Sequence, residues 1–209
     1  MEGIGVLESI LIPVKRLDRA KLRLSERLAP PDRRRLGLAM LADVLRATEK
    51  WSHRLVVTSD RDAEAVGLAF GCALVSDPGK GLNAAVSAGT QAALDAGSST
   101  LLVLPSDVPM VTSDDVNALF SYTEDVVVAP SGDGGTNALL RRPPQALEPS
   151  FGAGSAELHA RRAGDAGLSC RSVEMSSLVL DIDHYGDLVT LGGLANLRES
   201  VRLARELLG

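Results

Sequence analysis

The chain has 209 residues, of which 45% are hydrophobic and 23% are charged, and its formal net charge is −5. These values are typical of a globular protein with one large domain or two small ones, and the negative charge argues against a nonspecific nucleic-acid or anionic-membrane surface. No apolar run reaches the ~20 residues that cross a bilayer, and no signal peptide is recognisable. We therefore expect a cytoplasmic protein whose two distant cysteines are reduced.

The first half of the chain alternates short apolar runs with amphipathic stretches. We expect strands at residues 9–14, 55–58, 73–76 and 101–104. We expect helices at residues 30–48, 61–70 and 82–96, the second capped by Ser59 or Asp60. A basic amphipathic stretch at residues 16–29 precedes the first helix. The alternation implies a mostly parallel sheet with helices on both faces.

The second half of the chain departs from this alternation. After a helix at residues 113–122, two strands at 126–130 and 137–141 flank a glycine-rich turn, which indicates a hairpin. The remaining expected elements are a helix from Ser155, its cap, to about residue 166, strands at 170–175 and 178–182, and two closing helices. This half is interpreted as a mixed extension of the sheet that carries an acceptor pocket.

Asp107 follows the apolar run at residues 101–104. Such a run is typical of a strand buried on both faces, and Pro105 ends it. Ligands bind in the crevice beyond the carboxyl ends of such strands. Asp107 could instead cap the next helix, but Ser113 and Asp114 are better placed to do so. Because the charge pattern offers Asp107 no nearby salt-bridge partner, we expect a metal or phosphate role.

Asp181 and Asp183 are two residues apart at the end of an expected strand, so both side chains lie on one face. Two carboxylates on one face repel each other unless a cation lies between them. Magnesium in nucleotide sites takes one or two protein carboxylates together with phosphate oxygens. With Asp107, this pair is the candidate metal site, although Asp183 could also cap the helix that follows it.

Lys15 and Lys21 lie in the basic stretch after the first strand, where cations clamp a polyphosphate. The alternative for this stretch is a solvated basic helix face. Gly81 and Asn83 lie where a turn leads into a helix, and glycines there let the backbone approach an anion or a base. This turn lacks the ending of a Walker loop, so an ordinary turn explains it equally well.

Two further glycine loops carry Thr136, Gly152 and Ser155. Hydroxyls and free backbone N–H groups in such loops form a nest for phosphate or carboxylate groups, and a helix N-terminus at Ser155 adds a favourable field. Turn chemistry alone would explain the glycines of either loop. The two loops together, after a metal-bearing strand, favour an anion site.

Six motifs occur in order over nearly the whole chain. They are Pro-Val-Lys-x-Leu-x-x-Ala-Lys-x-Arg-Leu from residue 13, Asp-Pro-Gly-x-Gly-Leu-Asn from 77, Leu-Pro-x-Asp-Val-Pro from 104, Asp-Gly-Gly-Thr-Asn-Ala-Leu from 133, Phe-Gly-x-Gly-Ser from 151 and Asp-Ile-Asp from 181. Together they resemble the 2-phospho-L-lactate/phosphoenolpyruvate guanylyltransferase family of coenzyme F420 biosynthesis. One departure is His184-Tyr185, where the family has Thr or Leu and then Pro.

The resemblance implies an α/β fold with a Rossmann-like mixed sheet and helices on both faces, of the glycosyltransferase-A type found in nucleotidyltransferases. It implies one domain over residues 1–209, with a mainly nucleotide-binding half at 1–110 and a mainly acceptor-binding half at 111–209. The implied reaction transfers GMP from GTP to the phosphate of a three-carbon phospho-acid and releases pyrophosphate. The implied cofactor is Mg²⁺, as two ions.

The same resemblance assigns roles to the candidate residues. The implied residues are nucleotide-binding Lys15, Lys21, Gly81 and Asn83; metal-binding Asp107, Asp181 and Asp183; and acceptor-binding Thr136, Gly152 and Ser155. Among them, Asp107, Lys15 and Lys21 are the expected catalytic residues.

Three alternatives remain open. A nucleotidyltransferase of the same fold could act on a molybdopterin or a sugar phosphate, although 3% aromatic residues offer little stacking surface. A non-catalytic nucleotide-sensing domain is the second, and a structural module that uses the C-terminal leucine stripe is the third, although such stripes are more often core.

The Arg- and Ala-rich, Lys-poor composition suggests a bacterial source, which favours phosphoenolpyruvate over 2-phospho-L-lactate. The oligomeric state, including a homodimer, is open.

Overall fold

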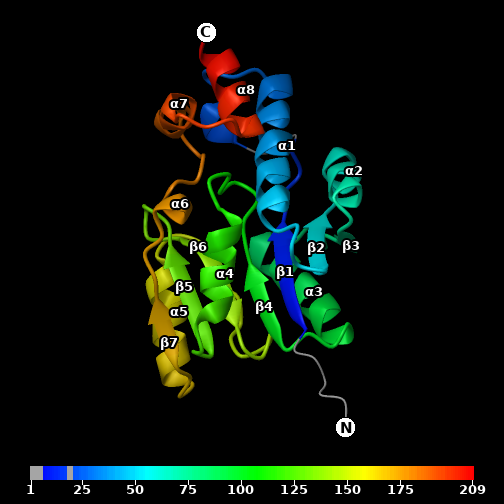
Figure 1. The fold of residues 1–209 in the computed structure, drawn as a ribbon, viewed down its shortest axis with the longest axis vertical. Coiled ribbons are helices and arrows are strands. Elements are labelled where there is room, and N and C mark those ends of the chain that lie inside the picture. Colours follow the sequence, from blue (N-terminus) through cyan, green and yellow to red (C-terminus); the bar gives the residue numbers. More distant parts are fainter. Residues whose placement is uncertain (1–6, 18–20) are drawn as a thin grey trace.

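The computed structural model describes residues 7–17 and 21–209, so part of the expected basic stretch, residues 18–20, lies outside the described residues. Seven strands form one sheet in the order β3-β2-β1-β4-β6-β5-β7 (Figure 1). The strands are β1 (Glu8–Pro13), β2 (His53–Thr58), β3 (Ala73–Ser76), β4 (Thr100–Val103), β5 (Val126–Pro130), β6 (Thr136–Arg141) and β7 (Cys170–Ser172). Only β6 runs antiparallel to its neighbours, which confirms the mixed sheet and the β5–β6 hairpin.

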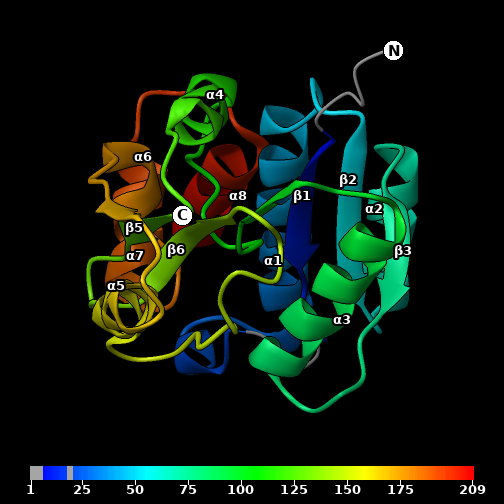
Figure 2. The ribbon, with the colours of Figure 1, turned by 90° about the horizontal axis from the view of Figure 1, so that it is seen from below.

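Helices cover both faces of this sheet because its central strands are apolar on both sides. The helices are α1 (Pro30–Ala47), α2 (Arg61–Ala69), α3 (Leu82–Asp95), α4 (Ser113–Ser121), α5 (Ser155–Asp165), α6 (Ser176–Val179), α7 (Tyr185–Gly193), α8 (Glu199–Leu208) and the 3-10 turn η1 (Leu22–Leu24). Along β1, Ile10 belongs to the apolar cluster that the sheet shares with α1, α2 and α4, whereas its neighbour Leu11 belongs to the cluster that includes residues of α3 and α5. Figure 2 accordingly shows α4 and α5 on opposite sides of the sheet.

A third apolar cluster joins the C-terminal helices to α1, beside which α8 lies in Figure 1. Leu36 of α1, Leu188 of α7 and Val201 of α8 are each 0% exposed within it. The expected leucine stripe is therefore largely core. Leu197 is the exception, because it precedes α8 and is 97% exposed.

The strand expected at residues 178–182 is wrong. Residues Ser176–Val179 form the short helix α6, and an extended segment follows without pairing in the sheet. The reason is that its buried residues serve two different clusters: Leu178 packs on the sheet core, whereas Ile182 packs with the C-terminal helices. The N–H of Ile182 donates to the carbonyl of Asp107 at 3.3 Å, so this segment crosses the carboxyl edge of the sheet.

Helix starts agree with the sequence to within a residue. Asp60 caps α2, as expected, through N–H groups of the first turn. Helix α4 is capped by Thr112 rather than by Ser113 or Asp114, because Thr112 and Asp115 form a reciprocal pair of side-chain to backbone hydrogen bonds. No helix in the described part of the chain is long and apolar enough to span a membrane.

Candidate active site

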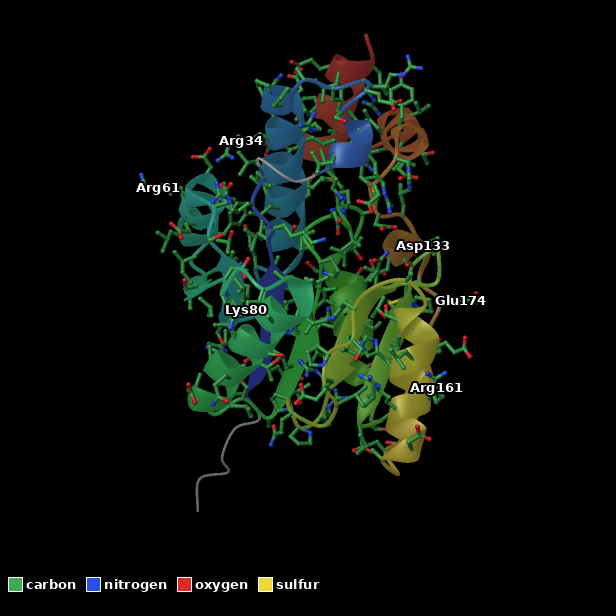
Figure 3. All side chains as sticks on the ribbon, turned by 180° about the vertical axis from the view of Figure 1, so that it is seen from behind. Arg34, Arg61, Lys80, Asp133, Arg161 and Glu174 are labelled. Atoms are coloured by element: carbon green, nitrogen blue, oxygen red, sulfur yellow. The ribbon has the colours of Figure 1, made fainter. Side chains whose placement is uncertain are left out.

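A cavity of about 490 Å³ opens at the carboxyl ends of β1 and β4. Its walls come from the loops after these strands, the β5–β6 turn, the loop before α5 and the segment before α7. Lys80, before α3, and Asp133, in the β5–β6 turn, lie over different halves of the sheet in Figure 3. Parallel strands that end at one edge bring such distant loops together, as the sequence predicts for a ligand site.

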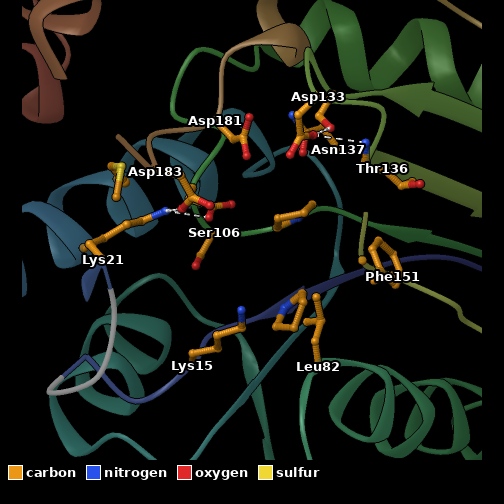
Figure 4. A pocket seen from close by; sticks show the side chains of 18 of the residues that line it. Lys15, Lys21, Leu82, Ser106, Asp133, Thr136, Asn137, Phe151, Asp181 and Asp183 are labelled. Atoms are coloured by element: carbon orange, nitrogen blue, oxygen red, sulfur yellow. Dashed lines mark hydrogen bonds and ion pairs between the residues drawn. The ribbon is translucent and has the colours of Figure 1, made fainter. Parts of the chain in front are cut away.

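Lys21 and two carboxylates form an ionic centre on one wall of this cavity. The Lys21 Nζ donates to Asp107 Oδ2 at 2.7 Å and to Asp183 Oδ1 at 2.8 Å (Figure 4). Burial disfavours the ammonium, but the two carboxylates outweigh burial and raise the pKa of Lys21. The expectation that Asp107 has no salt-bridge partner is therefore wrong, since the loop after β1 brings Lys21 to it.

Asp181 faces the same cavity in a different electrostatic environment. Burial, together with repulsion from the carboxylates of Asp107, Asp183 and Asp133, raises the pKa of Asp181. Burial alone would also raise the pKa of Asp183, but Lys21 and other cations nearby lower it. Other carboxylates, rather than cations, therefore dominate the surroundings of Asp181, and this environment favours the binding of a cation.

Asp183 does not cap the next helix. Helix α7 begins after His184, and it is the side chain of Asp187 that accepts the N–H groups of Asp183 and His184, at 3.0 and 2.6 Å. The carboxylate of Asp183 is instead directed to Lys21, with Arg23 Nη1 3.5 Å away. In this arrangement, no cluster of three His, Cys, Asp or Glu side chains in the described ranges is close enough to hold a metal ion.

Asp133 is a cavity residue that sequence reasoning missed, although it begins the motif at 133–139. Its carboxylate accepts hydrogen bonds from the Ser131 hydroxyl at 2.5 Å and from the Gly135 N–H at 3.1 Å. These bonds lower the pKa of Asp133. A fourth carboxylate therefore stands on the wall that carries Asp181 (Figure 4).

Of the four expected nucleotide residues, Lys21 belongs to the ionic centre, Lys15 lies on the opposite wall, and Gly81 and Asn83 flank the lining residue Leu82. Lys15 and Leu82 line the cavity across from the carboxylates (Figure 4). Gly81 has a φ of 95°, a left-handed conformation that glycine readily adopts, and helix α3 begins directly after it. Asn83 is turned to the loop before α5, since its Oδ1 accepts the Phe151 N–H at 2.7 Å and its Nδ2 donates to the Phe151 carbonyl at 3.2 Å. The expected nucleotide and acceptor loops are thus in direct contact.

The structure brings the two expected acceptor loops together. The hydroxyl oxygens of Thr136 and Ser155 are 2.8 Å apart, and Thr136 Oγ1 also lies 3.1 Å from Nδ1 of His159. Ser155 is not the expected cap, because α5 begins after Gly154 in a left-handed conformation and no side chain caps it. Both hydroxyl residues are buried, and the Thr136 oxygen points away from the carboxylates (Figure 4). Gly152 lines the cavity itself.

Comparisons with known proteins identify the family. The family model described as CofC-like guanylyl transferase matches residues 8–197. A phosphoenolpyruvate guanylyltransferase of Sphaerobacter thermophilus is 38% identical, covering 88% of this chain and 92% of that protein. A 2-phospho-L-lactate guanylyltransferase of Methanothermobacter thermautotrophicus is 33% identical, covering 93% and 90%.

The crystal structure of a putative nucleotide-diphospho-sugar transferase from Desulfovibrio desulfuricans G20 has a TM-score of 0.80 at 19% identity, covering 96% of this chain and 95% of that one. This likeness confirms the nucleotidyltransferase fold that the sequence predicts. The family match and the two relatives go further than the fold. The chain belongs to the CofC-like guanylyl transferase family.

Proposed function

We propose that this protein transfers GMP from GTP to the phosphate of a three-carbon phospho-acid and releases pyrophosphate, as a step of coenzyme F420 biosynthesis. The observation that carries this proposal is the cavity, where Asp181 and Asp183 stand on one wall and Lys15 on the other (Figure 4), and where Asp107 shares Lys21 with Asp183. A site with carboxylates facing cations suits two polyanionic substrates. The family membership of the chain supports the same reaction.

The chemistry needs positioning more than it needs a protein nucleophile. The phosphate of the acceptor is already an anion at neutral pH, and one of its oxygens attacks the α-phosphorus of GTP in line. The bond from the α-phosphorus to the β-phosphate bridge breaks, and pyrophosphate leaves with the electron pair. Lys15 and Lys21 are the residues that we expect to stabilise the charge that develops on this leaving group.

Mg²⁺ is the cofactor that the family implies. The described residues can supply part of its ligand set: no three of their carboxylates, thiols or imidazoles cluster closely enough to hold an ion alone, but magnesium in nucleotide sites takes one or two carboxylates together with phosphate oxygens. Asp107, Asp181 and Asp183 offer the hard oxygen ligands that this ion takes, and the raised pKa of Asp181 marks a carboxylate without enough positive charge around it. When bound, magnesium would neutralise phosphate charge between the two substrates. Two ions are our expectation, as for other nucleotidyl transfers.

Lys15→Ala is expected to raise the Michaelis constant for GTP by at least about tenfold, because an ionic hydrogen bond to the triphosphate is lost. The constant for the acid should change much less. Steady-state kinetics with each substrate varied in turn measures both constants. Lys50→Ala is the matched control, since Lys50 is exposed and lies between α1 and β2. A rise confined to the acid constant would show that this loop serves the other substrate.

Thr136→Val and Ser155→Ala are each expected to raise the Michaelis constant for the acid by about ten- to a hundredfold, because each removes a hydroxyl from the proposed anion site. The GTP constant should hardly change. Gly152→Val should be worse than either, because the φ of 146° at Gly152 strains any other residue. Thr190→Val is the control, as its exposed hydroxyl donates to the Gly186 carbonyl of its own helix and lies outside the cavity lining. An unchanged acid constant with a raised GTP constant in Thr136→Val would place the hairpin at the nucleotide.

The acceptor is identified by turnover with GTP and each of three acids: phosphoenolpyruvate, 2-phospho-L-lactate and a phosphoglycerate. We expect phosphoenolpyruvate to give the highest kcat/KM. A preference for another acid would keep the reaction and change the substrate. A nucleotide-sensing domain would instead bind GTP without releasing pyrophosphate in any of the three reactions.

A cytoplasmic location and a homodimer remain predictions, checked by fractionation of the source cells and by sedimentation.

A further inference from the structure

His159 lies on α5, directly behind the wall that carries the expected acceptor residues, and is 0% exposed. Its Nε2 is 3.0 Å from the backbone nitrogen of Ser150, and its Nδ1 is 3.1 Å from Thr136 Oγ1. The ring of Phe151 stands edge-on to the imidazole, with 5.4 Å between the centroids. One buried side chain therefore joins the start of β6 to the loop that leads into the cavity.

The partners of His159 determine which nitrogen carries the proton. A backbone N–H can only donate, so the Nε2 that faces Ser150 has no hydrogen, and the hydrogen of the neutral ring is on Nδ1. Burial, together with the charges of Arg141 and Arg162, lowers the pKa of His159 to about 4, so the ring is neutral at pH 7. The Nδ1–H therefore donates to the hydroxyl oxygen of Thr136.

This direction of donation decides what the two hydroxyls can do. Only one hydrogen lies between Thr136 Oγ1 and Ser155 Oγ, and the oxygen of Thr136 already accepts from His159. Among the described residues, neither hydroxyl has another acceptor, so the pair keeps one hydrogen that it can donate. Thr136 lines the cavity. A hydroxyl hydrogen that is free to donate there would form a hydrogen bond with an anionic ligand.

The loop that His159 holds is also held from other sides. Arg141 Nη1 donates to the carbonyl of Leu147 at 2.8 Å, Arg162 donates to the Ser150 hydroxyl, and the amide of Asn83 pairs with the backbone of Phe151. These contacts fix the loop on β6, α5 and α3. Among the described residues, His159 is the one side chain that is hydrogen-bonded both to this loop and to the hydroxyl of Thr136, which in turn bonds that of Ser155.

We propose that His159 is the positioning residue of the acceptor site: as the neutral Nδ1–H tautomer, it holds the loop at residues 150–152 against Thr136 and leaves the Thr136–Ser155 pair with a donor for the anionic acid. His159 does not touch the reacting atoms. The inference rests on the proposed function for the identity of the acid, whereas the tautomer is independent of it.

The tautomer is measured directly by nitrogen-15 NMR of the full chain with labelled histidine at pH 7.5. The sequence has three histidines, so His53→Gln and His159→Gln variants assign the signals. We expect one imidazole with its proton on Nδ1, which does not titrate between pH 6 and 8. An Nε2-protonated ring, or an imidazolium, at position 159 would overturn the proposal.

The positioning role is measured by kinetics of His159→Leu and His159→Asn. His159→Leu should raise the acid Michaelis constant by about ten- to a hundredfold, with kcat and the GTP constant within about threefold of wild type. Asn can place an amide donor near the Nδ1 position, so His159→Asn should recover most of that loss. His53→Leu is the control, because His53 is hydrogen-bonded to Ser9 at the opposite edge of the sheet.

The outcomes separate the two proposals. If the wild-type protein forms no conjugate with any of the three acids, the proposed function is wrong. If it forms a conjugate but His159→Leu leaves the acid constant unchanged, or if His159→Asn is no better than a folded His159→Leu, the role of His159 is wrong. Should His159→Leu not fold, as shown by circular dichroism, the comparison of His159→Asn with wild type decides: a rise of tenfold or more in its acid constant would contradict the rescue.

Discussion

Asp107→Asn is expected to lower turnover by on the order of a thousandfold while the protein stays folded, which corresponds to several kcal/mol of lost transition-state stabilisation. The substitution keeps the shape of the side chain and removes its charge. It takes one carboxylate from the proposed magnesium ligands and one of the two carboxylates that hold the Lys21 ammonium. Pyrophosphate release in magnesium, with a thermal melt of the same sample, measures both parts of the expectation.

The matched control for this variant is Asp114→Asn. Asp114 is an exposed carboxylate in the first turn of α4, seven positions along the chain and outside the cavity. It should retain activity close to that of wild type. A folded Asp107→Asn protein with more than about a tenth of wild-type turnover would contradict the assignment of Asp107 to catalysis.

Lys21→Met is expected to lower kcat/KM by about a hundredfold or more and to lower the melting temperature as well. The side chain of Lys21 is 7% exposed and lies between Asp107 and Asp183, so its loss leaves two carboxylates without the cation that separates them. Removing one partner of a fully buried pair costs about 3–5 kcal/mol. The cost here should be smaller, because the carboxylates are 29% and 42% exposed and water screens them.

Arg23→Met provides the comparison for Lys21→Met. Arg23 is a second cation near Asp183, but its side chain is 63% exposed and its Nη1 is 3.5 Å from the carboxylate. We expect only a modest loss of activity and almost no change in melting temperature. Equal losses in the two variants would mean that general positive charge matters at this wall, and not the contact that Lys21 makes.

Much of the fold could be predicted from the sequence, because most of its strands lie in short apolar runs that end at proline or polar residues. The alternation of Ile10 and Leu11 between two cores is the period-two pattern that such runs encode. The segment at 178–182 was mispredicted because its apolar residues have the same spacing, yet Leu178 and Ile182 fill two separate clusters. The tertiary fold decides which cluster each residue joins, and the local sequence pattern does not predict this choice.

The candidate site was predictable in its location but not in its contacts. Parallel strands place the loops that carry Lys21 and Asp107 at one edge, but the pair is separated by 86 positions, and nothing local specifies that the two side chains meet. His159 carried one usable signal, since it follows Ser155 by four residues and so shares its face of α5. That spacing could have placed it behind the glycine loops.

The mass of the product tests most directly whether this cavity joins GMP to an acid phosphate. The wild-type protein is incubated with GTP, magnesium and phosphoenolpyruvate, and the mixture is analysed by mass spectrometry alongside a pyrophosphate assay. We predict a conjugate in which GMP is linked through its phosphorus to the phosphate of the acid, with one pyrophosphate released for each conjugate formed. Hydrolysis of GTP without a conjugate, or intact GTP with each of the three acids, would contradict this function.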